Sequence, residues 1–152
     1  MVNEKKIIKV EKLAKTYGPK DNFALDHIDL AIKEGTIFGL LGPNGAGKST
    51  FINILAGLTN KTSGKVSVCG INLDLDPKTV RGNIGVVPQE INIDPFFTPL
   101  QILEIQSGLY AVKENKKKNQ QILGELGLKE MANAYSRSLS GGMKRRLMVA
   151  KA

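Results

Sequence analysis

The sequence lacks several features that would place it in whole classes of protein. It has one cysteine, Cys69, so no disulfide can form within the chain and nothing indicates an oxidising compartment. It has no tryptophan and only 5% aromatic residues, which argues against the stacking surfaces of nucleic-acid-binding proteins. Its longest compact apolar stretch, residues 37–41, is far shorter than the roughly 20 residues of a membrane-spanning helix. We therefore expect a cytoplasmic globular domain that binds no nucleic acid.

Acidic residues are also missing from the last part of the chain. The 152 residues carry 22 Lys and Arg against 14 Asp and Glu, a net charge of +8, and the last acidic residue is Glu130. Five basic residues and no acidic one follow it, whereas residues 1–130 are close to balanced. The basic character therefore belongs mainly to one segment, and it is poor evidence for a nucleic-acid-binding face.

The apolar pattern predicts two kinds of strand. Residues 6–13 alternate partly and residues 28–32 alternate fully between apolar and polar side chains, so we expect half-buried, antiparallel strands there. Residues 65–68 form a further short strand candidate before a Cys-Gly turn. The nearly continuous apolar runs 36–41 and 84–87 do not alternate, which is typical of strands that are covered on both faces. The chain should therefore contain both half-buried and fully buried strands.

Helical segments are predicted between and after these strands. Residues 48–58 repeat apolar side chains at helical spacing directly after a glycine-rich loop. Thr98 and Pro99 are a good helix start, because Thr suits the N-cap and Pro the first helical position. Two further helices are expected, over residues 119–126 and residues 143–152.

The strongest motif is the segment GPNGAGKST, which satisfies the phosphate-loop pattern G-x-x-x-x-G-K-[ST]. Its glycines let backbone N–H groups converge on an anion, and the helix that follows directs its positive end to the same place. The lysine supplies a positive charge for the β- and γ-phosphates, and the serine hydroxyl is a ligand for Mg²⁺. The residues predicted to bind ATP phosphates are Gly42, Pro43, Asn44, Gly45, Ala46, Gly47, Lys48, Ser49 and Thr50.

The alternative interpretation of this segment is a glycine-rich turn with an incidental lysine. Its position between an apolar strand candidate and a helix is the context that a phosphate loop requires, and it favours the functional interpretation. The guanine-specific pattern N-K-x-D is absent, since Asn60-Lys61 is followed by Thr and Ser. We therefore expect ATP rather than GTP.

A second glycine-rich turn precedes the last predicted helix. Two glycines that follow a serine at a helix start form another N-terminal anion site, although an ordinary N-cap with a flexible turn would have the same residues. This segment consists of Leu139, Ser140, Gly141, Gly142 and Met143.

The two glycine-rich segments together resemble the ATP-binding cassette (ABC) family over essentially the whole chain. The resemblance implies an α/β fold, a P-loop NTPase core with an antiparallel β subdomain and a helical subdomain. It divides the chain into a nucleotide-binding core with the β subdomain over residues 1–89, a helical subdomain over residues 90–135, and the signature with the start of its helix over residues 136–152.

The resemblance also assigns roles outside the phosphate loop. Tyr17 is similar to the aromatic residue that stacks on adenine, although an ordinary packed tyrosine is the alternative. Gln89 is similar to the hinge glutamine that contacts Mg²⁺ or the attacking water, and a solvated loop amide is the alternative. Lys48 and Gln89 are thus the candidate catalytic residues, and Ser49 and Gln89 the candidate metal ligands. In a head-to-tail dimer the signature, residues 139–143, contacts the ATP that is held by the partner's P-loop.

The sequence departs from the family pattern in two respects. Met143 stands where the family most often has glutamine. This substitution is similar to variants found in export-type cassettes. The family continues past the signature helix into a strand that ends in Asp, a catalytic Glu and a switch His, and none of these occurs before Ala152. We therefore expect a truncated cassette that hydrolyses no ATP as an isolated polypeptide.

The resemblance implies an ATPase subunit that couples ATP binding and hydrolysis to transport, with export expected, by a membrane permease. Such a subunit is cytoplasmic and peripheral on the inner face of the cell membrane. Two alternatives remain: a non-hydrolysing nucleotide-binding or regulatory module, and a soluble cassette ATPase that acts on ribosomes or DNA.

Overall fold

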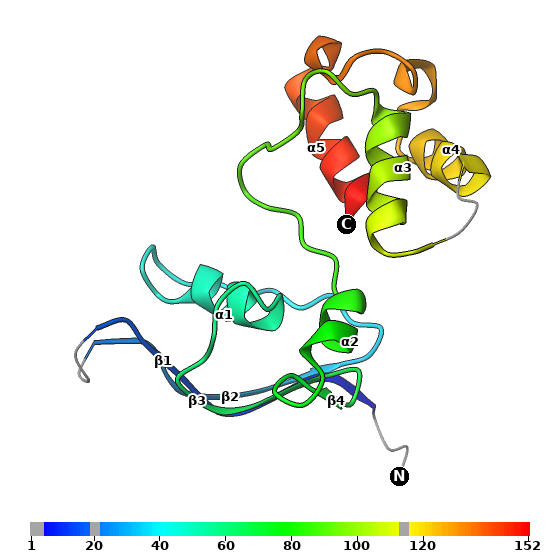
Figure 1. Ribbon diagram of the computed structural model, residues 1–152. Coiled ribbons are helices and arrows are strands. Elements are labelled where there is room, and N and C mark those ends of the chain that lie inside the picture. The colour runs from blue at the N-terminus through cyan, green and yellow to red at the C-terminus, as the bar shows by residue number, and fades with distance from the viewer. Residues whose placement is uncertain (1–4, 19–21, 113–115) are drawn as a thin grey trace. The chain divides into compact units, whose positions relative to one another are not determined.

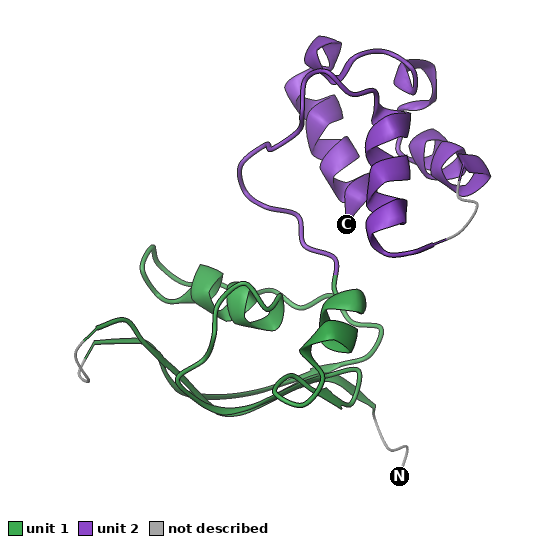
Figure 2. Ribbon diagram, in the orientation of Figure 1, with its two compact units in different colours: residues 1–84 green, residues 85–152 purple. Residues whose placement is uncertain are grey.

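The computed structural model describes residues 5–18, 22–112 and 116–152, and the chain divides into two compact units, residues 1–84 and 85–152 (Figure 2). Among the described residues, no helix is both long enough and apolar enough to cross a membrane. The first unit contains β1 (Lys6–Thr16), β2 (Phe23–Lys33), α1 (Lys48–Leu55), β3 (Ser63–Val68), β4 (Ile71–Asn72) and α2 (Pro77–Gly82) (Figure 1).

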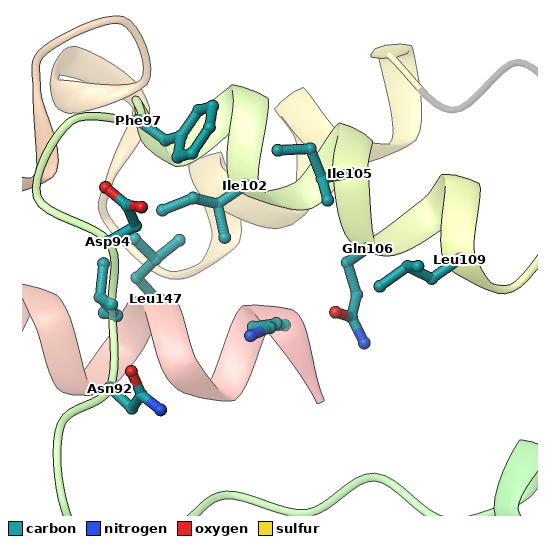
Figure 3. A pocket seen from close by; sticks show the side chains of 10 residues that line it. Asn92, Asp94, Phe97, Ile102, Ile105, Gln106, Leu109 and Leu147 are labelled. Carbon is teal, nitrogen blue, oxygen red and sulfur yellow. The ribbon is translucent and has the colours of Figure 1, made fainter.

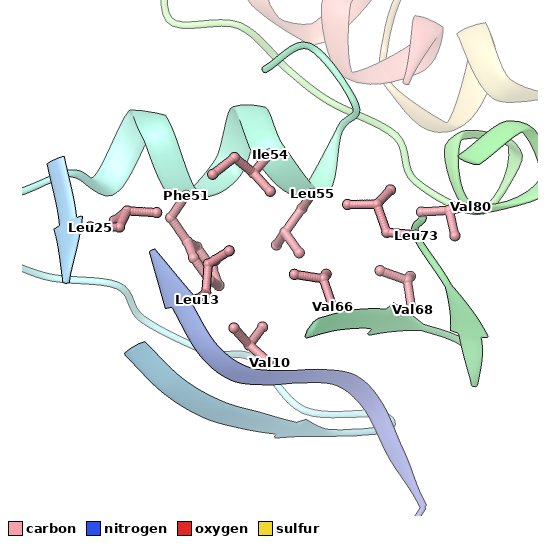
Figure 4. Close-up of a cluster of buried hydrophobic side chains, with 10 residues drawn as sticks. All are labelled: Val10, Leu13, Leu25, Phe51, Ile54, Leu55, Val66, Val68, Leu73 and Val80. Carbon is pink, nitrogen blue, oxygen red and sulfur yellow. The ribbon is translucent and has the colours of Figure 1, made fainter. Parts of the chain in front are cut away.

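The strands of the first unit form an antiparallel sheet in the order β2-β1-β3-β4. Helix α1 packs on one face of this sheet and turns its apolar side toward the strands (Figure 4). The core between them consists of Val10, Leu13, Leu25, Phe51, Ile54, Leu55, Val66, Val68, Leu73 and Val80. The antiparallel pairing that the alternating segments predict is therefore confirmed.

A β-bulge explains why the apolar residues of β1 alternate only partly. Val10 and Leu13 both face the core, although they are three residues apart. The extra residue is Lys12, whose φ of 46° lies in the left-handed region, and the register with β2 shifts between Val10 and Leu13. The Lys12 N–H donates to Oδ1 of Asp29 at 2.8 Å, so the side chain of Asp29 provides a partner for the bulge.

Strand β2 carries a matching bulge. Leu25 and Ile28 both contact the core at a spacing of three, and His27 between them has a φ of 45°. The register moves by one at the first bulge and returns at the second, because Val10 pairs with Leu30, Leu13 with Ile28 and Lys15 with Leu25. The two strands thus bend together without a lasting slip in pairing.

The second unit is helical. It contains α3 (Pro99–Leu109), α4 (Lys116–Glu125), α5 (Gly141–Lys151) and the short 3₁₀ helices Lys129–Met131 and Ser136–Ser138. Its buried core consists of Leu100, Ile102, Leu103, Leu123, Leu128, Ala132, Leu139 and Leu147. Each of the three α-helices contributes to this core, which keeps the start of α5 and the loop before α3 in one compact body.

The start of α3 confirms the helix that Thr98 and Pro99 predict. The Thr98 hydroxyl accepts a hydrogen bond from the Gln101 N–H at 3.2 Å, and the Gln101 side chain accepts one from the Thr98 N–H at 2.9 Å. This reciprocal capping box satisfies two N–H groups at the helix start.

The strands predicted over residues 36–41 and 84–87 are wrong. Neither run forms a strand, and Ile37 and Leu41 are 105% and 93% exposed. A strand covered on both faces needs hydrogen-bonded neighbours and a layer of side chains on each side. The strands of the described residues all belong to the antiparallel sheet, and none pairs with either run. An apolar run predicts a preference for burial, but it supplies neither the pairing nor the cover.

Candidate functional site

Residues 42–47 form an exposed loop that leads directly into α1. Gly45 and Gly47 have φ angles of 84° and 83°, which glycine adopts without strain. The Ala46 N–H donates to the Pro43 carbonyl oxygen at 3.3 Å and closes the turn. Gly47 is the N-cap of α1 and offers no side-chain acceptor, so no side chain caps the first N–H groups of the helix. These donors and the helix dipole favour an anion at this point.

Strand β2 fixes the position of this loop. The backbone of Gly47 lies so close to β2 that a Cβ would be 2.2 Å from the Ala24 carbonyl oxygen and 2.7 Å from Leu25 Cδ2. Any side chain at position 47 would therefore force the loop away from the sheet. The glycine that the motif requires is explained here by close packing as well as by its backbone angle.

The Lys48 ammonium lies across the loop. Its Nζ donates to the carbonyl oxygens of Gly42 at 2.7 Å and Pro43 at 2.6 Å. These bonds hold a positive charge at the entrance of α1, within the same few residues as the N-terminal N–H donors. A phosphate at this position would meet a cation and a helix dipole together, which is the arrangement that phosphate loops use.

Ser49 and Thr50 follow in the first turn of α1. Ser49 is exposed, and its hydroxyl makes no hydrogen bond with another described residue. A hydroxyl that is accessible beside a phosphate-binding loop fits a ligand of Mg²⁺, which prefers oxygen. Thr50 is half-buried and contributes to the same turn.

Tyr17 directly follows β1, in the same unit as the loop. Its side chain is 53% exposed, and the Lys15 Nζ lies 4.7 Å from the ring centroid. The ring is therefore not an ordinary packed core residue, and it makes a cation–π contact with Lys15. An exposed ring of this kind has the surface that stacking on a nucleobase requires.

The signature segment begins α5 in the second unit. Leu139 is buried in the helical core and anchors the turn. Ser140 is the N-cap, and its Oγ accepts a hydrogen bond from the Met143 N–H at 3.3 Å. A Cβ on Gly141 or Gly142 would meet no atom within 4 Å, so both glycines face open space. This helix start is thus exposed to an approaching anion, and one of its donors is already satisfied.

Gln89 lies in the loop before α3, in the same unit as the signature. It is exposed, and its side-chain amide has no hydrogen-bond partner among the described residues. Its carbonyl oxygen accepts a hydrogen bond from Nη1 of Arg145 at 2.8 Å, and the Pro88 carbonyl oxygen accepts one from the same nitrogen at 3.0 Å. The structure therefore connects Gln89 with α5 through Arg145. No sequence pattern distinguishes this arginine from its basic neighbours.

A cavity of about 190 Å³ opens in the helical unit between α3, α5 and the loop before α3 (Figure 3). Apolar side chains form most of its wall, with Asn92, Asp94, Gln106 and Lys151 at its polar positions. Its other lining residues are Ile93, Phe97, Ile102, Ile105, Leu109 and Leu147. The helical unit thus has a concave apolar surface that is distinct from the start of α5.

The predicted site residues fall into two groups. Tyr17 and the phosphate loop belong to residues 1–84, and Gln89 and the signature belong to residues 85–152. Each group contains an exposed polar side chain without a hydrogen-bond partner among the described residues, Ser49 in the first and Gln89 in the second.

Residues 25–152 match the family described as ABC transporter. The Nod factor export ATP-binding protein I of Cupriavidus metallidurans is 38% identical, over 96% of this chain and 48% of the relative. The linearmycin resistance ATP-binding protein LnrL of Bacillus subtilis is 37% identical, over 96% of this chain and 47% of the relative. The daunorubicin resistance ATP-binding protein DrrA2 of Streptomyces coeruleorubidus is 37% identical, over 94% and 44%.

A solved structure described as the ATP binding subunit of an ABC transporter has the same fold. The two structures superimpose with a TM-score of 0.82 at 26% sequence identity. The match covers 96% of this chain and 61% of the chain of the solved structure. The chain spans about half the length of the curated relatives it matches. These similarities confirm the resemblance to ATP-binding cassettes and the α/β, P-loop NTPase fold class. Because the match extends over residues 25–152, most of its length, the chain belongs to the ABC transporter family.

Proposed function

We propose that this chain is the ATP-binding part of an export transporter, in which binding and hydrolysis of ATP drive a membrane permease. One observation carries the proposal: the Lys48 ammonium and the uncapped start of α1 lie together in one loop. Relatives named for export and for resistance support the direction of transport.

The first unit would hold the nucleotide. Lys48 would exchange its bonds with the loop carbonyls for the β- and γ-phosphate oxygens, while the N–H groups at the start of α1 bind the same phosphates. The exposed Ser49 hydroxyl would be a ligand of Mg²⁺, which when bound neutralises phosphate charge. The exposed ring of Tyr17 would stack on the adenine.

The second unit would supply Gln89 as the second Mg²⁺ ligand and the signature as a site for a second ATP. In a head-to-tail dimer, residues 139–143 of one chain would face the ATP on the phosphate loop of the other. The open space around Gly141 and Gly142 leaves room for that phosphate. Such an isologous pair would explain why one chain has two anion-binding helix starts.

Nucleotide titration tests the proposal. The 152-residue chain should bind MgATP, and Lys48→Ala should weaken the binding at least about tenfold, because it removes a charged phosphate donor. Lys65→Ala is the matched control, since Lys65 is an exposed lysine of β3 in the same unit. Affinities can be measured by isothermal titration calorimetry. Absence of binding, or equal affinities of both variants, would contradict the proposal.

The 152-residue polypeptide should bind ATP without turning it over. Lys48, Ser49 and Gln89 can bind phosphates and metal, but the resemblance assigns activation of the attacking water to an acidic residue after the signature helix. Phosphate release by the purified polypeptide should therefore stay at background. Turnover that disappears in Lys48→Ala would show that this expectation is wrong.

The cavity of the helical unit is the proposed contact for the permease, and this contact would keep the protein peripheral on the inner face of the membrane. Its apolar wall fits an amphipathic helix that buries a few apolar side chains. Ile105→Lys should reduce co-purification with the co-expressed permease, because Ile105 lines the cavity and is 48% exposed. Val149→Lys is the control, since Val149 is equally exposed, at 49%, but does not line the cavity. Equal losses in both variants would exclude the cavity as the contact.

A further inference from the structure

The loop from residue 85 to residue 93 has little hydrogen bonding of its own. Among the described residues, its hydrogen bonds are the two that Arg145 donates, one to the Pro88 carbonyl oxygen and one to the Gln89 carbonyl oxygen. The loop also lies close to the residue that ends α5. A Cβ on Gly85 would be 2.3 Å from the Ala152 carbonyl oxygen. The loop therefore takes its position from α5 rather than from bonds within itself.

The side chain of Arg145 suits this contact. One guanidinium nitrogen reaches two successive carbonyl oxygens, and the charge strengthens both bonds. The neighbouring residues Lys144 and Arg146 have no hydrogen bond to this loop, so the contact is specific to one residue of the basic segment.

The contact fixes the backbone of Gln89 but leaves its side chain free. Arg145 binds main-chain oxygens on both sides of the Gln89 Cα, while the Gln89 amide is exposed and has no partner among the described residues. Arg145 also follows Ser140 by little more than one turn of α5. A shift of the start of α5 would thus be passed to Gln89 through a short, regular helix.

We propose that Arg145 is a positioning residue that ties Gln89 to the signature helix, and this inference rests on the proposed function. Gln89 would serve the nucleotide on its own chain, whereas Ser140, Gly141 and Gly142 would serve the nucleotide of the partner chain. Arg145 thus links the two nucleotide sites of the dimer within one chain.

A single tryptophan can report on this link, because the chain has none of its own. Ile91 lies two residues after Gln89, is 42% exposed, and Ile91→Trp keeps an apolar side chain in the loop. In that background, Arg145→Ala should raise acrylamide quenching of the tryptophan about twofold or more, since the loop loses its hydrogen bonds to α5. Arg145→Lys should restore part of the protection, because a lysine ammonium also donates to carbonyl oxygens.

The control variant is Arg146→Ala, which removes the same charge from the adjacent position of α5 and should leave the quenching unchanged. Far-UV circular dichroism of all variants shows whether α5 is intact. If Arg145→Ala and Arg146→Ala give the same quenching in folded protein, Arg145 does not position the loop and the proposal is overturned.

A second measurement separates this proposal from the proposed function. ATP affinity is measured once with Mg²⁺ and once with EDTA, and the first value is divided by the second. This ratio should fall about threefold or more in Arg145→Ala, because a displaced Gln89 binds the metal less well. The affinity in EDTA should stay unchanged. An unchanged ratio would overturn the positioning role. If the parent chain binds no ATP at all, the proposed function fails, and the quenching comparison still decides the role of Arg145.

Discussion

Helices α1 and α5 both begin at a glycine-rich turn, but their first N–H groups are satisfied in different ways. Gly47 precedes α1 and offers no side-chain acceptor. Ser140 precedes α5, and its Oγ accepts a hydrogen bond from the Met143 N–H at 3.3 Å. The start of α1 therefore keeps all of its donors for a ligand and depends on packing against β2 for its position. The start of α5 stabilises itself and presents a hydroxyl together with the remaining donors.

The two units also build their cores from different elements. The helical unit gathers side chains from α3, α4 and α5 in one core. The first unit buries one face of its sheet under α1, while Ile37 and Leu41 of the apolar run before the phosphate loop stay exposed. The helical unit also leaves large apolar side chains exposed, among them Phe96 and Leu109.

The largest expected effects come from core substitutions, and they test whether the units are separate. Leu147 and Ile54 are both 0% exposed, one in each core. Leu147→Ala and Ile54→Ala should each lower the free energy of unfolding by about 2 to 5 kcal/mol, because each leaves a cavity. Hydrogen exchange should show lost protection mainly in residues 85–152 for Leu147→Ala and in residues 5–84 for Ile54→Ala. Equal losses in both units for either variant would contradict the division.

Substitutions of two glycines sharpen the description of the phosphate loop. Gly45 and Gly47 have nearly the same left-handed φ, but only at position 47 would a Cβ meet the backbone of β2. Gly45→Ala should therefore cost about 1 kcal/mol of stability, and Gly47→Ala about 3 kcal/mol, since its loop must also move. Urea unfolding measures both, and MgATP affinity should fall more in Gly47→Ala. Equal costs would show that the contact with β2 does not matter.

Removal of the helix caps tests the comparison of helix starts. Thr98 takes part in a reciprocal capping box with Gln101, whereas Ser140 makes a single bond of 3.3 Å. Thr98→Ala should lower the stability of the helical unit by about 1 kcal/mol, and Ser140→Ala by about half as much. Thermal unfolding followed by circular dichroism gives both values. A larger loss for Ser140→Ala would mean that the signature hydroxyl is mainly a structural cap.

The smallest effect concerns the N-cap of α2 and depends on pH. Hydrogen bonds from the Thr79 side chain, and then from its backbone N–H, hold the pKa of Asp76 below its ordinary value. A carboxyl with a lowered pKa in the folded state stabilises the protein above its ordinary pKa, and this contribution is lost as the pH falls through the folded value. Below about pH 4, the midpoint of thermal unfolding should thus fall slightly less in Asp76→Asn than in the parent chain. Identical profiles would contradict the contribution of this cap.

Local chemistry made several elements predictable from the sequence. Thr98 and Pro99 mark the start of α3 because a hydroxyl acceptor and a fixed φ act within one turn. Gly47 marks the start of α1 in a different way, through a left-handed φ and without a side-chain acceptor. The roles of the phosphate loop, Tyr17, Gln89 and the signature stay predictions, since they concern ligands and a partner chain.

Features that depend on distant residues were not predictable. The runs 36–41 and 84–87 have the composition of buried strands, but burial depends on neighbours that a local pattern does not contain. Arg145 could not be distinguished from Arg146 before the structure showed which of them reaches the Gln89 carbonyl oxygen. The bulges had a visible signal, since Val10 and Leu13 are spaced by three, but a spacing of three also suits a helix.

The paired bulges determine where the first hairpin can change length. Lys12 and His27 are the extra residues at the register shifts of β1 and β2, so loss of either one would leave the other cross-strand pairs opposite each other. Loss of a residue from a regularly paired stretch, such as residues 8–10 of β1, would instead turn part of the strand over and move its apolar side chains to the opposite face. Within the middle of this hairpin, single-residue gaps in an alignment should therefore be placed at these two positions, with Asp29 free to vary wherever Lys12 is missing.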